Sequence, residues 1–184
     1  MQKYRVGIIG ATGMVGQRFI TLLADHPWFE IHALAASARS AGMTYEEAVG
    51  SRWAMKTPIP EKVAKMVVMD ASDVKNVSDL CDFVFCAVNM KKDEIKALEE
   101  AYAKTETPVI SNNSANRGMA DVPMLIPEIN PEHAHAIERQ RERLDTKVGF
   151  IAVKPNCSIQ SYVPALTPLY SCGIESVMVS TYQA

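Results

Sequence analysis

A glycine-rich turn close to the start of the chain limits the fold more than any other feature. Residues 3–9 form a β-branched apolar run that predicts a strand, and the run from Gly10 to Gly16 (Gly-Ala-Thr-Gly-Met-Val-Gly) follows it directly. Val15 and Phe19 then begin an apolar stripe at helical spacing, with Pro27 just beyond the stripe. Strand, glycine turn and helix are the opening of a dinucleotide-binding βαβ unit, in which the helix start receives a pyrophosphate. The alternative is a structural turn without a ligand.

The end of the second predicted strand indicates which dinucleotide is bound. Residues 29–36 form this strand, and an NAD-binding unit has an Asp or Glu at its end to hold the ribose 2′-hydroxyl. Here the chain has Ser37, Ala38, Arg39 and Ser40 instead. An arginine with two serine hydroxyls suits a 2′-phosphate, which a carboxylate would repel. We therefore expect NADP rather than NAD, and the alternative is an ordinary polar loop.

The rest of the chain alternates between apolar runs and helical patterns, which predicts a parallel α/β sheet. Further strands are expected at 63–69, 82–88, 108–111 and 149–153, and helices at 91–104 and 130–144. Residues 42–60 look like an irregular insertion that packs against the cofactor domain, without an assignable role. We expect a Rossmann-type NADP-binding domain over 1–154, followed at 155–184 by the beginning of an α+β catalytic and dimerisation domain.

A cysteine at the end of the last predicted strand is the candidate nucleophile. Pro155 and Asn156 break the strand at 149–153, and residues 158–169 predict a helix. Cys157 thus lies at a strand-to-helix turn, where the helix dipole and the unbonded N–H groups of the first turn favour a thiolate. A thiolate held on such a turn is a nucleophile. The alternative is that Cys157 is a small buried apolar group, as many cysteines are.

A second polar segment follows the strand at 108–111. The run from Ser111 to Arg117 (Ser-Asn-Asn-Ser-Ala-Asn-Arg) begins where open α/β sheets bind ligands. Arg117 is a candidate for bidentate binding of a phosphate or carboxylate, although such a run can also be a simple polar turn. His133 and His135 are two residues apart and so point to different faces of a helix. We predict no metal site.

Composition excludes several classes of function. The 184 residues carry a formal net charge of -2, which offers no basic surface for nucleic acid or an anionic membrane. No apolar run approaches the roughly 20 residues that span a bilayer, and no signal-peptide pattern is present at the N-terminus. The four cysteines show neither C-x-x-C spacing nor disulfide-scaffold density. We expect a cytoplasmic protein that acts on a small molecule.

Taken together in this order, the motifs resemble those of aspartate-semialdehyde dehydrogenase, in the branch found in archaea and fungi. The resemblance runs from the first strand to the last residue and rests on the segments 10–16, 37–40, 111–117, 125–130, 155–158 and 180–184. It implies reduction of aspartyl phosphate to aspartate semialdehyde with NADPH, a step towards lysine, methionine and threonine. It also implies a homodimer or tetramer for the intact protein.

The resemblance further implies roles for individual residues. Cys157 would displace phosphate and carry the acyl thioester, Gln183 would position the acyl group, and Asn156 and Arg117 would hold the phosphate. The residues expected to bind or adjoin NADP are Gly10, Thr12, Gly13, Met14, Val15, Ser37, Arg39, Ser40, Cys86 and Asn112.

The resemblance also limits what the 184 residues can do alone. In the family, the acid–base histidine, further substrate-binding residues and most of the second domain follow the position of Ala184. We therefore expect an N-terminal portion that binds NADP weakly, ending in the first strand of the second domain at 175–183. Alternatives are a malonyl-CoA reductase, an N-acetyl-glutamyl phosphate reductase, or an NADP-binding module without activity.

Overall fold

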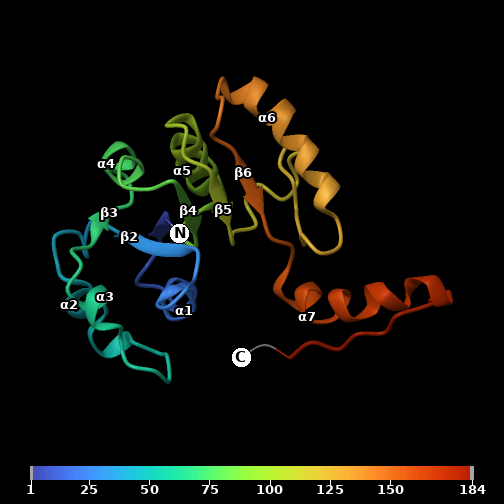
Figure 1. Ribbon diagram of the computed structural model, residues 1–184, viewed down its shortest axis with the longest axis horizontal. Coiled ribbons are helices and arrows are strands. Elements are labelled where there is room, and N and C mark those ends of the chain that lie inside the picture. Colours follow the sequence, from blue (N-terminus) through green and yellow to red (C-terminus); the bar gives the residue numbers. More distant parts are fainter. Residues whose placement is uncertain (1, 183–184) are drawn as a thin grey trace.

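The computed structural model describes residues 2–182 and contains a single parallel sheet (Figure 1). The strand order is β3-β2-β1-β4-β5-β6, and every neighbouring pair is parallel. The order reverses at β1 and β4, which defines the switch point of a doubly wound sheet. The strands are β1 Tyr4–Ile9, β2 Phe29–Ala36, β3 Met69–Asp70, β4 Phe83–Cys86, β5 Val109–Ser111 and β6 Ile151–Val153.

Helices cover both faces of this sheet, as the predicted fold class requires (Figure 1). One buried apolar cluster contains residues of α1 and α2, and the other contains Tyr102, Ala103 and Leu144 from α5 and α6. The α-helices are α1 Met14–Leu23, α2 Tyr45–Val49, α3 Glu61–Ala64, α4 Val74–Ser78, α5 Lys92–Lys104, α6 Ala136–Leu144 and α7 Cys157–Leu166. The 3-10 helices are η1 Gly50–Arg52, η2 Pro131–His135 and η3 Thr167–Cys172.

The strand ends align across the sheet. In the backbone register Ile9 pairs with Cys86, Cys86 with Ser111, and Ser111 with Val153. The residues that directly follow these four strands therefore lie side by side at one edge of the sheet. This is the edge at which the sequence placed its candidate ligand-binding segments.

The prediction that 42–60 is irregular was wrong for 45–52, which form α2 and η1, whereas 53–60 contain no helix or strand. Thr44 caps α2 with a capping box, because its hydroxyl accepts from the Glu47 main chain and the Glu47 carboxylate accepts in return. Gln17, buried on α1, donates to the Arg52 carbonyl at 3.0 Å and accepts from the Ala54 N–H at 2.8 Å. These bonds join the segment to the first helix, in agreement with the prediction that it packs against the cofactor domain.

Two other predicted elements differ from the structure. The strand expected at 63–69 is reduced to β3, since α3 occupies the start of that apolar run. The predicted helix over 130–144 is divided into η2 and α6. Asn130 accounts for the first part of this division, because its side chain accepts from the Ile126 N–H and donates to the Met124 carbonyl instead of capping an α-helix.

The predicted strand at 175–183 does not form over 175–182, and Gln183 lies outside the described residues. Val177, Met178 and Val179 are all exposed, with Met178 fully so. A strand is stabilised by hydrogen bonds to a neighbouring backbone, and residues 2–182 provide no neighbour for this segment. The alternating pattern was therefore not sufficient to produce the strand.

A carboxylate joins the end of α5 to the approach to β6. Glu106 has a positive φ of 62° and accepts from the main-chain N–H groups of Lys147 (3.0 Å), Val148 (2.6 Å) and Gly149 (2.9 Å). These bonds, beginning with that from Gly149, lower the pKa of Glu106. Gly149 is tightly placed, because a Cβ there would lie 1.8 Å from the Ala103 carbonyl oxygen.

We predict that Glu106→Gln flattens the pH dependence of stability in mildly acidic solution. Because the folded-state pKa is depressed, the stabilisation by Glu106 is present above the unfolded-state pKa of about 4.3 and is lost as pH falls through the folded value. Urea unfolding near neutrality and at about pH 4 measures this loss. Glu128→Gln is the control, since Glu128 is exposed and has no hydrogen bond within residues 2–182. An equal pH dependence in wild type and Glu106→Gln would contradict the prediction.

Candidate functional site

The turn between β1 and α1 requires glycine at two positions. Gly10 has a φ of +88°, and a Cβ there would lie 2.5 Å from the Ala87 carbonyl oxygen. At Gly16 a Cβ would lie 2.3 Å from the Gly10 carbonyl oxygen. These contacts bring the first turn of α1 against β1 and against the end of β4.

Gly13 differs from Gly10 and Gly16, because the fold does not require a glycine at this position. Its φ is −75°, and a Cβ would only touch the Gly10 carbonyl oxygen at 3.4 Å. Gly13 is the N-cap of α1, where no side chain caps the helix and no acidic residue occupies the first turn. Gly13 also lines a cleft, so a bare backbone here leaves room for a phosphate to approach the helix start.

A cleft of about 1060 Å³ lies at this edge of the sheet. It extends from the glycine turn past the end of β2 to the residues that follow β3 and β4. Six of the residues predicted to bind NADP line it: Gly10, Thr12, Gly13, Ser37, Arg39 and Ser40. Two motifs that are separated in the sequence therefore line one cleft.

The other four predicted cofactor residues do not line this cleft. Met14 and Val15 are exposed on the first turn of α1, next to Gly13. Cys86 is buried at the end of β4, and burial, followed by the charge of Glu99, raises the pKa of its thiol. Asn112 uses its main-chain N–H to bond the Cys86 carbonyl at 2.8 Å. Their roles as neighbours of the cofactor stay predictions.

Sequence reasoning missed two other sides of the cleft. Met43, Ala48 and Arg52 line it from the segment at 42–60. Asp70 and Ser72 line it after β3, and hydrogen bonds from Ser72 lower the pKa of the Asp70 carboxyl. The polar side chains that follow the predicted strand at 63–69 were the available signal, but sequence reasoning assigned them no role.

Cys157 lies where the sequence predicted, at the first residue of α7. Asn156 is the N-cap, and its side-chain oxygen accepts from the Ser158 N–H at 3.0 Å and from the Ser158 hydroxyl at 2.7 Å. The Cys157 Sγ lies 3.7 Å from the same oxygen. Cys157 is exposed, so the buried alternative is excluded in this structure.

Arg117 is tied to the same strand-to-helix turn. Its Nε donates to the Lys154 carbonyl at 3.0 Å and its Nη2 contacts the Asn112 carbonyl at 3.4 Å. The Lys154 N–H in turn donates to the Ser111 carbonyl at 3.0 Å. Arg117 and Asn156 are the two candidate phosphate ligands. Arg117 lies in the loop after β5 and Asn156 in the turn after β6, and these hydrogen bonds join the two connections.

Lys154 is a further cation that sequence reasoning did not select. Partial burial and then the charge of Arg117 lower the pKa of its ammonium, while Cys157 acts in the opposite direction. Lys154 is therefore electrostatically coupled to both groups. Its position three residues before the cysteine was the signal available in the sequence.

One predicted site residue remains, and the two histidines that were not assigned a role can also be placed. Gln183 lies outside the described residues, so its role stays a prediction. His133 and His135 are exposed on η2, and the His133 Nδ1 bonds the Asn130 side chain at 2.9 Å.

Comparison with known proteins decides the family. Residues 5–137 match the model of the semialdehyde dehydrogenase NAD-binding domain. The chain belongs to the semialdehyde dehydrogenase family. The matched range includes the glycine turn, the cleft residues and Arg117, and it ends before Cys157.

Curated members of this family extend the match over nearly the whole chain. The chain is 42% identical to an aspartate-semialdehyde dehydrogenase of Archaeoglobus fulgidus, covering 99% of this chain and 51% of that protein. The enzyme of Methanothermobacter thermautotrophicus is 44% identical, with 97% and 50% covered, and that of Aspergillus fumigatus 40%, with 99% and 49% covered. The chain therefore spans about half the length of these semialdehyde dehydrogenases.

Solved structures agree with the sequence comparison. A crystal structure of aspartate semialdehyde dehydrogenase with NADP from Candida albicans has a TM-score of 0.80 at 36% identity, covering 93% of this chain and 48% of that chain. A Vibrio cholerae enzyme complexed with ASA has a TM-score of 0.65 at 29% identity, covering 92% of this chain and 48% of that chain.

Within residues 2–182, no helix combines the length and apolar character needed to cross a membrane.

We predict that alanine at Gly13 and at Gly16 separates ligand binding from folding. Gly16→Ala forces a Cβ into backbone and should destabilise the fold by about 1–3 kcal/mol. Gly13→Ala meets no such contact, so the melting temperature should stay near that of wild type while dinucleotide affinity falls at least several-fold. Thermal melting and fluorescence titration with NADP and NAD measure the two effects. Unchanged affinity in Gly13→Ala would show that the helix start does not receive the phosphates.

Proposed function

We propose that the protein to which this chain belongs is an NADP-dependent aspartate-semialdehyde dehydrogenase. In this reaction L-aspartyl 4-phosphate is reduced to L-aspartate 4-semialdehyde and phosphate is released. The observation that supports it best is the adjacency of a nucleophile and two cations, Cys157, Arg117 and Lys154, at the edge of the sheet that also holds the cleft. The named relatives in archaea and fungi support the choice of substrate.

NADP is the proposed cofactor, and the residues of the cleft fit it. The end of β2 offers Ser37, Arg39 and Ser40 and no carboxylate, which suits a 2′-phosphate. The bare start of α1 at Gly13 suits the pyrophosphate. The relative from Candida albicans was crystallised with NADP. When bound, the reduced nicotinamide supplies a hydride.

The proposed chemistry begins with the Cys157 thiolate, which attacks the acyl carbon of the substrate. The C–O bond to phosphate breaks with its electron pair, phosphate leaves, and an acyl thioester remains on Cys157. Arg117 and Asn156 bind the departing phosphate, and the positive charge of Lys154 favours the anionic groups gathered there. A hydride supplied by the bound cofactor would reduce the thioester carbonyl, and Cys157 would then leave as a thiolate when the C–S bond breaks to release the aldehyde. We assign Gln183 to orient the acyl group.

The wider organisation of the protein is proposed on the same grounds. We place the NADP-binding domain at 1–154 and the beginning of the catalytic and dimerisation domain at 155–184, because β6 ends at Val153 and α7 begins at Cys157. The family resemblance supports a homodimer or tetramer, a cytoplasmic location, and a place in lysine, methionine and threonine synthesis.

Arg39→Ala should reduce the preference for NADP over NAD. A guanidinium–phosphate hydrogen bond contributes about 1.5–3 kcal/mol, so the dissociation constant for NADP should rise about tenfold or more. The dissociation constant for NAD should change little, because NAD has no 2′-phosphate. Titration of both cofactors into wild type and variant provides the measurement. A proportional loss of affinity for both would place Arg39 elsewhere on the cofactor.

Cys157→Ala should abolish turnover without weakening NADP binding. The assay follows NADP reduction by aspartate semialdehyde in the full-length gene product, with phosphate present or absent. Cys172→Ala is the matched control, since Cys172 is the other exposed cysteine and lies on η3. Activity should require phosphate, persist in Cys172→Ala and disappear in Cys157→Ala. Activity that requires coenzyme A instead of phosphate would identify a thioester reductase and overturn the proposed substrate.

A further inference from the structure

Glu99 is a fully buried acidic residue that the proposed chemistry does not use. It lies on the face of α5 that packs on the sheet, in the same helix as the core residues Tyr102 and Ala103. Burial of a carboxylate is unfavourable unless hydrogen bonds replace the lost water. The position of such a group is therefore informative about what surrounds it.

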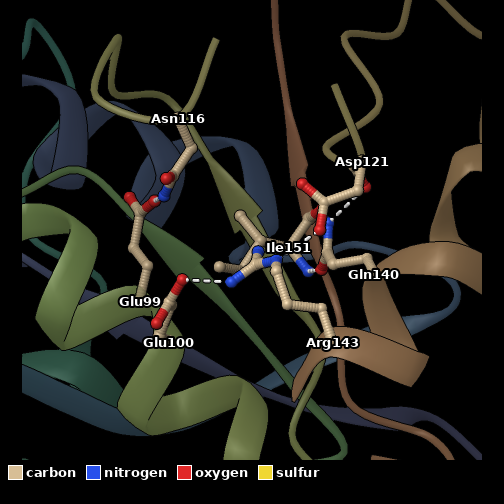
Figure 2. A network of polar contacts seen from close by, with 7 residues as sticks. All are labelled: Glu99, Glu100, Asn116, Asp121, Gln140, Arg143 and Ile151. Atoms are coloured by element: carbon tan, nitrogen blue, oxygen red, sulfur yellow. Dashed lines mark hydrogen bonds and ion pairs between the residues drawn. The ribbon is translucent and has the colours of Figure 1, made fainter. Parts of the chain in front are cut away.

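Three hydrogen bonds to the Glu99 carboxylate come from the segment that ends in Arg117. The Oε1 atom accepts from the Ser111 hydroxyl at 2.5 Å and from the Asn113 amide at 3.0 Å. The Oε2 atom accepts from the Asn116 amide at 2.7 Å, and Figure 2 shows this pair end to end between the helix and the loop. The two oxygens of this carboxylate thus bind the loop at Ser111, its first residue, at Asn113, and at Asn116, the residue before Arg117.

The donors are themselves ordered by this arrangement. Ser111 is the last residue of β5, and its hydroxyl accepts from the Asn113 N–H at 3.0 Å while it donates to Glu99. Asn116 is buried, as Glu99 is. A carboxylate is the side chain that can accept all these bonds, because it has no N–H or O–H that would face a donor.

Arg117 depends on this loop for its position. Its guanidinium donates to the carbonyl oxygens of Lys154 and Asn112, and within residues 2–182 it forms no ion pair. Its backbone is continuous with Asn116, which Glu99 fixes. A shift of the loop would therefore move the guanidinium relative to Cys157.

We propose that Glu99 is a positioning residue for Arg117, which holds this arginine ready for the phosphate of the substrate. The inference rests on the proposed function, in which Arg117 binds that phosphate. Glu99 itself does not touch substrate or cofactor. It acts by fixing the loop at 111–117 from beneath through the contacts of Ser111, Asn113 and Asn116.

The test is Glu99→Gln in the full-length gene product, assayed in the direction of NADP reduction with aspartate semialdehyde and inorganic phosphate. The substitution keeps the shape and the oxygen that faces Ser111 and Asn113, but it places an N–H₂ group against the N–H₂ group of Asn116. We expect the KM for phosphate to rise about tenfold, since a mismatched buried hydrogen bond is worth that much. The KM for NADP should stay within a factor of about two, because the cleft does not include Glu99.

Two further variants separate positioning from general damage. The double variant Glu99→Gln with Asn116→Asp exchanges donor and acceptor across the bond in Figure 2 and should restore most of the phosphate KM. Glu100→Gln is the matched control, because it removes the same charge one residue further along α5, where Glu100 pairs with Arg143 at 2.6 Å. Glu100→Gln should leave the phosphate KM unchanged.

Asn116→Ala provides a milder change if Glu99→Gln does not fold, since it removes a single donor to Glu99 and should raise the phosphate KM several-fold. An unchanged phosphate KM in the folded variants would overturn the inference while leaving the proposed function intact. Equal rises in the KM for phosphate and for NADP, or no recovery in the double variant, would also overturn it. A wild-type protein without phosphate-dependent activity would overturn the proposed function, and this inference with it.

Discussion

The parallel register of β1, β4, β5 and β6 is the constraint on which the site depends. Because Ile9, Cys86, Ser111 and Val153 lie in one row, the chain leaves the sheet at the same level four times. Four segments that are separated in the sequence therefore meet at one edge of the sheet. They are the glycine turn, the end of β4, the loop that ends in Arg117 and the turn that contains Cys157. A slip of one residue in a strand would reverse the direction of its side chains and separate these groups.

Hydrogen bonds fasten the connections once the register has brought them together. Gln17 joins α1 to the segment at 42–60, Glu99 joins α5 to the loop after β5, and Glu106 joins the end of α5 to the approach to β6. Each is a single side chain that bonds backbone, hydroxyl or amide groups of another segment of the chain. In an open sheet, such bonds limit how far the loops at the binding edge can move.

The sequence was sufficient for the parts of the fold that local patterns determine. Apolar runs located the long strands, and the glycine turn located α1 together with the cleft residues beside Gly13. The Pro155-Asn156 break placed Cys157 at the first residue of α7, because a proline and an N-cap specify that turn locally. The parts that it missed depend on contacts between distant segments: the place of 42–60 beside the cleft, the loss of a strand at 175–182, and Lys154 as a partner of Arg117.

The four cysteines divide into two chemical classes. Cys81 and Cys86 are buried, and burial raises the pKa of Cys81 to about 12, whereas Cys157 and Cys172 are exposed. In the folded chain of residues 1–184, a thiol reagent therefore reaches Cys157 and Cys172, and unfolding exposes Cys81 and Cys86 as well. The protein thus contains its own reporter of core opening, which labelling followed by mass spectrometry could read without any added probe.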